Sequence, residues 1–80
     1  MILKLAMDIS ESQLYVSPEL YDDRGKLISL SPAFNTIREA LEFAEFAVRD
    51  TNGLSEGFPV TFTYSKSKSS ENDIVFLVSA

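Results

Sequence analysis

The sequence predicts an α+β fold: a small antiparallel sheet of about five strands with one helix packed on one face, in the order β-β-β-α-β-β. Segments with the alternating pattern of strands lie on both sides of a single stretch with helical spacing. Turns containing glycine or proline separate these segments, and none of them repeats at a fixed period. One amphipathic helix covering one face of a sheet buries both apolar surfaces. We expect residues 1–80 to form a single domain.

Three strands are expected before the helix. Residues 2–8 alternate between two faces and form the first. Residues 13–21 are rich in β-forming residues and form the second, with an edge or a bulge at Pro18, because proline cannot donate to a ladder. The segment 22–25 contains two aspartates and a glycine and predicts a tight turn, so residues 26–30 should return as the third strand of a hairpin.

The helix is expected from about residue 36 to residue 51. Thr36 and Glu39 have the spacing of a capping box, in which each side chain satisfies an amide at the start of a helix. Asn52 and Gly53 supply a left-handed stop. Apolar residues recur between these ends at steps of three and four and form one stripe. The stripe consists of Ile37, Ala40, Leu41, Ala44, Ala47 and Val48.

Two strands are expected after the helix. Residues 58–65 alternate strictly between an aromatic and a hydroxyl face. We interpret the aromatic face as core rather than as a base-stacking surface beside Lys66 and Lys68. Residues 66–73 are polar and should form a connecting loop. Residues 74–78 are continuously apolar, which predicts a strand that is buried on both faces and central in the sheet.

The composition excludes several kinds of chemistry. The chain has no histidine and no cysteine, so the usual catalytic triads, imidazole acid–base catalysis and zinc sites of the usual kind are unavailable. No glycine-rich phosphate-binding motif occurs. The adjacent carboxylates Asp22 and Asp23 have the setting of a turn rather than of a calcium loop. We therefore predict that the protein is not an enzyme and needs no cofactor and no metal.

The charge balance bears on the kind of partner. Twelve acidic against seven basic residues give a formal net charge of −5. This charge repels nucleic-acid phosphates and attracts a protein with a basic surface, although acidic residues also simply keep proteins in solution. We expect no direct binding to nucleic acid. The sequence also shows neither a membrane-spanning segment nor a signal peptide, so no membrane association and a cytoplasmic location are expected.

One aromatic side chain is predicted on the outer face of the helix. At about 100° per residue, Phe46 lies nearly opposite the apolar stripe, among charged neighbours, and Phe43 lies at the edge of the stripe. Exposed aromatic anchors dominate the energetics of many protein interfaces. The sequence leaves open whether the Phe46 ring is exposed or covered by residues 54–57. The predicted partner-binding residues are Phe46, Phe43, Glu39, Glu42, Glu45 and Asp50.

These observations favour a non-catalytic protein-binding module, such as an acidic inhibitor that occludes a basic surface on a larger partner. Inhibitors of host defence from phages and mobile elements share this size and charge, but no motif in the chain points to such a family. The alternative is a self-assembling structural protein. The first and last strands offer apolar side chains to both faces of the sheet, so the face without a helix needs cover. Curling toward a barrel or a homodimer through the sheet face would provide it. An enzyme based on carboxylates ranks third.

Overall fold

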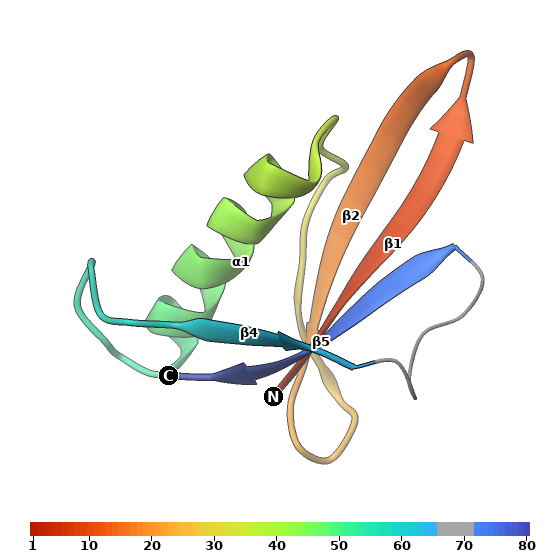
Figure 1. Ribbon diagram of the computed structural model, residues 1–80. Coiled ribbons are helices and arrows are strands. Elements are labelled where there is room, and N and C mark those ends of the chain that lie inside the picture. The colour runs from red at the N-terminus through yellow and green to blue at the C-terminus, as the bar shows by residue number, and fades with distance from the viewer. Residues whose placement is uncertain (66–71) are drawn as a thin grey trace.

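The structure is a computed structural model that describes residues 1–65 and 72–80. The described residues form a five-stranded antiparallel sheet and one helix in the predicted order, so the α+β fold class is confirmed (Figure 1). The helix lies on one side of the sheet. The elements are β1 (Ile2–Ser10), β2 (Gln13–Tyr21), β3 (Leu27–Leu30), α1 (Ile37–Thr51), β4 (Thr61–Tyr64) and β5 (Asp73–Ser79).

The strand order is β3-β2-β1-β5-β4, with β1 at the centre. β1 pairs with β2 along its whole length and with β5 from Ile2 to Ala6, and beyond that point the β1–β2 hairpin projects from the sheet (Figure 1). The prediction that residues 74–78 are central and buried on both faces is confirmed only in part. β5 has a neighbour on each side, and Val75 is buried on the face without a helix. Leu77 points to the same face but is 49% exposed, so this end of the strand is not buried on both faces.

Pro18 interrupts the pairing of β2, as predicted. On one side β2 keeps a continuous register with β1. On the other side the ladder with β3 ends where Glu19 pairs with Leu30, and the next contact is an isolated bridge between Val16 and Phe34. The N–H of Val16 points toward this side, where it donates to the Phe34 carbonyl at 2.7 Å. The nitrogen of Pro18, two residues further on, faces the same side, where no donor is needed.

α1 begins and ends where the capping residues predicted, although Glu39 binds the Thr36 hydroxyl and not the Thr36 N–H. Thr36 accepts a hydrogen bond from the Glu39 N–H at 3.1 Å and donates its hydroxyl hydrogen to the Glu39 carboxylate at 2.9 Å. The helix ends at Thr51, and Gly53 takes the left-handed conformation with a φ of +65°. Both boundaries therefore lie within one residue of the prediction.

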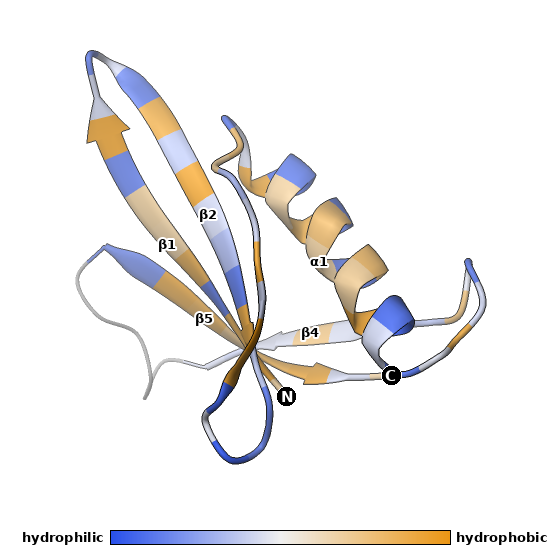
Figure 2. Cartoon of the chain, turned by 180° about the vertical axis from the view of Figure 1, so that it is seen from behind, coloured by the Kyte–Doolittle hydropathy of each residue, from blue (hydrophilic) through white to orange (hydrophobic). Residues whose placement is uncertain are grey.

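The core lies between α1 and the central strands. Along β1 and β2, apolar segments alternate with polar ones, so each strand sends one side of its residues toward the helix (Figure 2). The helix contributes mainly small residues to this contact, which allows it to approach β2 closely. The fully buried cluster consists of Leu3, Leu5, Val16, Leu20, Ala40, Ala44 and Val48.

β4 is shorter than the alternation predicted. It begins at Thr61, because Pro59 cannot donate to a ladder and the preceding residues form the loop from α1. Phe62 and Tyr64 each make an edge-on contact with Phe76 of β5, at ring centroid distances of 6.0 and 6.2 Å. Phe62 is partly buried against the core, whereas Phe58 and Tyr64 are exposed, so the aromatic face is core only in part. Most of the predicted connecting loop, including both lysines, lies outside the described residues.

Candidate functional site

Phe46 lies on the outer face of α1 and is 61% exposed. The ring stands between two shallow hollows, and both hollows also include Asp50. Leu54 and Glu56 line the smaller hollow, so the loop after α1 approaches the ring without covering it. The question that the sequence left open is thus resolved in favour of an exposed ring.

The larger hollow separates α1 from the edge strand β3 and has a volume of about 450 Å³. Ile28 and Ser29 of β3 line one side, and Phe43 and Phe46 line the other. Phe43 is held in place by Phe34, with ring centroids 5.7 Å apart, and is partly buried. It therefore contributes to the fold as well as to the wall of the hollow.

Three of the four acidic residues of α1 already bond to other side chains of the helix or its cap. Glu39 belongs to the helix cap, about two helical turns before Phe46. Glu42 lies 3.9 Å from the Arg38 guanidinium, and Glu45 lies 3.3 Å from the Arg49 guanidinium. None of these three acids lines either hollow. The structure thus brings Phe43, Phe46 and Asp50 together and leaves the other predicted site residues on the surrounding helix surface.

Asp50 and Glu56 are the exposed acids that line the hollows beside Phe46, and Asp50 lines both of them. It makes no ion pair within residues 1–65 and 72–80. Counting all charged side chains, α1 carries a net charge of −2. A basic side chain of a partner that approaches Phe46 would therefore meet an available carboxylate at Asp50.

Arg49 organises the surface beside Phe46. Its Nε donates to the Phe58 carbonyl at 2.7 Å, and its Nη2 donates to the Glu45 carboxylate at 3.3 Å. The side chain is largely buried and ties the loop after α1 to the helix. The spacing of Glu45 and Arg49 signals their pairing in the sequence. The bond to Phe58 joins an arginine to a backbone carbonyl in an irregular loop, and no sequence pattern marks it.

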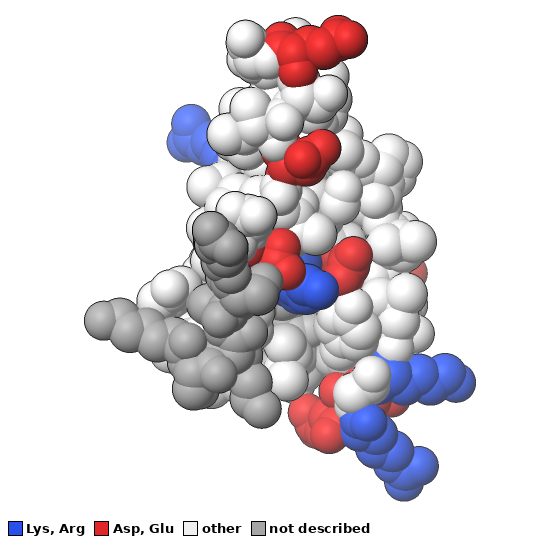
Figure 3. All heavy atoms as spheres, turned by 90° about the vertical axis from the view of Figure 1, so that its right-hand side faces the viewer, with Lys and Arg blue, Asp and Glu red and all other residues white. Residues whose placement is uncertain are grey.

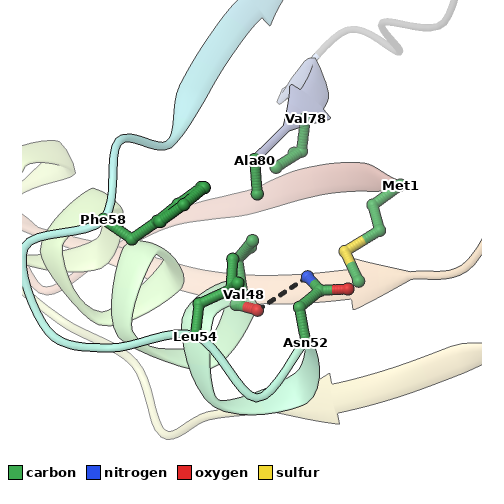
Figure 4. Close-up of a pocket in the computed structure, with 7 residues that line it drawn as sticks. All are labelled: Met1, Val48, Asn52, Leu54, Phe58, Val78 and Ala80. Carbon is green, nitrogen blue, oxygen red and sulfur yellow. Dashed lines mark hydrogen bonds between the residues drawn. The ribbon is translucent and has the colours of Figure 1, made fainter.

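A separate hollow of about 330 Å³ opens where the end of α1 faces the end of β5 (Figure 4). Its polar side chain, Asn52, donates to the Val48 carbonyl at 2.8 Å. None of the lining side chains is charged. The lining residues are Met1, Val48, Asn52, Leu54, Phe58, Val78 and Ala80.

The adjacent carboxylates of the β2–β3 turn have structural partners. Asp22 accepts the N–H groups of Arg24 and Lys26, both at 2.9 Å, which is the role of an aspartate in a turn. Asp23 accepts the Met1 amino group at 2.8 Å, and this hydrogen bond lowers the pKa of Asp23. In the described part of the chain, no three acidic residues come together as a metal site.

Comparisons of the chain with protein-family models, with curated proteins and with solved structures find no match. No helix in residues 1–65 and 72–80 is both long and apolar enough to cross a membrane. The geometry of the exposed surfaces is therefore the basis for assigning a function.

Proposed function

We propose that this protein is a non-catalytic protein-binding module whose partner docks on the outer face of α1 around Phe46. The observation that supports the proposal is the exposed Phe46 ring between two hollows. A ring in this position offers a large apolar contact, and the hollows beside it accept side chains from a partner. Interfaces obtain most of their binding free energy from a few anchors of this kind.

The charge of the chain indicates the chemistry of the partner. The net charge is −5 for the chain and −2 for α1, and Asp50 adjoins the ring. A partner with a basic surface gains a faster encounter and a correct orientation from this charge. The module would act as an inhibitor by occupying that surface sterically. Because the chain has no cysteine, it suits a reducing compartment, and we place this interaction in the cytoplasm.

The surface around Phe46 is preorganised for binding. The ring projects from the middle of a 15-residue helix that is capped at its start, and Arg49 fixes the neighbouring loop. A rigid surface loses little conformational entropy when a partner docks, so more of the contact free energy remains as affinity.

An affinity-capture experiment tests the proposal with three baits: the wild-type protein, Phe46→Ala and Ile9→Ala. Ile9 is the matched control because it is 75% exposed and lies near the tip of the β1–β2 hairpin. We expect proteins from the source cells that the wild type and Ile9→Ala both retain and Phe46→Ala loses. If the three baits retain the same proteins, the Phe46 surface is not the binding site.

A further inference from the structure

The sheet face opposite α1 carries a row of side chains that crosses all five strands. The register places Leu27 beside Tyr21, Tyr21 beside Ile2, Ile2 beside Leu77, and Leu77 beside Thr63. Side chains of directly paired residues point to the same face of a sheet. Four strands therefore contribute a large apolar or aromatic side chain to one continuous row.

This face remains open to solvent in part. Leu27 is 43% exposed and Leu77 is 49% exposed, and Leu30, which pairs with Glu19 in the adjacent row, is 64% exposed. The helix lies on the other side of the sheet and cannot cover these side chains. Figure 3 views the helix-free side, whose centre is mostly uncharged around one small cluster that contains both signs of charge.

Four polar side chains near the centre of this face, Lys4, Glu19, Tyr21 and Asp73, form a bonded cluster. The Lys4 ammonium lies 3.4 Å from the Asp73 carboxylate and 3.9 Å from the Glu19 carboxylate. Tyr21 donates its hydroxyl hydrogen to Glu19 at 2.7 Å. Burying a charged group costs free energy when the group has no bonding partner. Each of these groups already has a partner on the same face. The face can therefore lose its water without leaving these groups unpaired.

The edges of the sheet are poor sites for assembly. The two edge strands, β3 and β4, have four residues each. Pro32 follows β3 closely and Pro59 precedes β4. Short edges flanked by proline disfavour the addition of a further strand. The face is thus the better surface for joining another sheet.

We propose that a second copy of this chain docks on the helix-free face, so that the two sheets pack against each other. Five strands about 4.8 Å apart and about six residues long cover roughly 500 Å² on each copy. The total of roughly 1,000 Å² reaches the lower limit for a specific interface. The face also carries an apolar row and both signs of charge, so one patch can serve both sides of a twofold pair.

The solution mass over a series from micromolar to millimolar concentration tests this proposal. For the wild type, we expect a species of twice the 8.9 kDa chain mass. Leu77→Glu and Leu30→Glu should each raise the dissociation constant of the dimer by at least about tenfold. The reason is that a buried carboxylate without a partner opposes association. Circular dichroism establishes whether each variant is folded, and two sites are used so that one misfolded variant does not decide the result.

Two controls separate this face from the rest of the surface. Ile9→Glu places the same charge on the helix side of the hairpin and should leave the dimer intact. Phe46→Ala should also leave it intact, since Phe46 belongs to the opposite side of the molecule. The proposal is overturned if the wild type stays at 8.9 kDa throughout the series, if both folded face variants still dimerise like the wild type, or if Phe46→Ala dissociates the dimer.

Discussion

Thr36 shows how a single side chain determines where an element begins. Its hydroxyl both accepts from the Glu39 N–H and donates to the Glu39 carboxylate. The capping-box prediction has the carboxylate bind the backbone N–H of the cap residue, whereas here it holds the cap hydroxyl. The helix start could be predicted because both partners lie within four residues of each other. Their exact pairing depends on side-chain rotamers that the sequence does not specify.

Replacing Thr36 by alanine should lower the free energy of unfolding by about 1 kcal/mol, because an amide of the first turn loses its acceptor. Urea denaturation followed by circular dichroism measures the change. Thr36→Ser retains the hydroxyl and should keep most of the stability. Equal stabilities of the alanine variant and the wild type would show that this cap does not stabilise α1.

Tyr21 is the residue at which the helix-free face becomes sensitive to pH. Its hydrogen bond to Glu19 is the main reason that its pKa lies above the ordinary value of 10.0, and burial and the charges of Glu19 and Asp73 act in the same direction. Because the pKa in the folded state is raised, the stabilising contribution is complete below pH 10.0 and is lost as the pH rises through the folded-state pKa.

A titration of phenolate absorbance should therefore show one tyrosine ionising above its ordinary range, and Tyr21→Phe should remove that step. Glu19→Gln should move the step to lower pH, since the amide carries no negative charge. Tyr15→Phe is the matched control, because Tyr15 donates instead to the neutral Gln13 side chain. A high-pH step that survives in Tyr21→Phe would contradict the assignment.

At the scale of elements, local signals predicted α1 and the β2–β3 hairpin, whereas contacts between distant segments were not predicted. The helical period placed Phe46 on the outer face, and the structure agrees. The same period could not show that Phe43 packs against Phe34, because the 31–35 segment has no regular pattern. The alternating pattern of residues 58–65 likewise could not show that β4 begins only at Thr61, because the alternation continues through Pro59.

The loop after α1 depends on Arg49. We expect Arg49→Ala to increase hydrogen exchange at the Phe58 amide, which donates to the Ser55 carbonyl at 3.2 Å, because the arginine no longer holds the Phe58 carbonyl. Arg38→Ala is the control, because Arg38 pairs with Glu42 on the exposed surface of the helix. Equal exchange in both variants would mean that Arg49 does not order the loop.

At the scale of the whole molecule, the strand order could not be predicted from the sequence. Pairing of Ile2–Ala6 with Asp73–Leu77 joins the two ends of the chain, and local patterns carry no information about such contacts. The sequence did indicate that one helix leaves a sheet face uncovered. The barrel alternative for covering it is wrong, because β3 and β4 end the strand order on opposite edges. Packing against a second copy remains as the proposed cover.

The molecule thus presents two surfaces on opposite sides. The outer face of α1 carries the exposed Phe46 ring beside the Asp50 carboxylate, which we propose to be the site for a different, basic protein. The helix-free face carries a wide apolar row with internally paired charges, which suits a second copy. Because the sheet separates these surfaces, a dimer leaves both Phe46 surfaces available for partners.

The most direct test of the Phe46 surface is the dissociation constant of the purified captured partner, measured by titration calorimetry for the wild type, Phe46→Ala and Ile9→Ala. We predict that Phe46→Ala loses more than about 1 kcal/mol of binding free energy, or about a fivefold rise in Kd, and that Ile9→Ala binds like the wild type. A Kd for Phe46→Ala within about a factor of two of the wild-type value would contradict the proposed function.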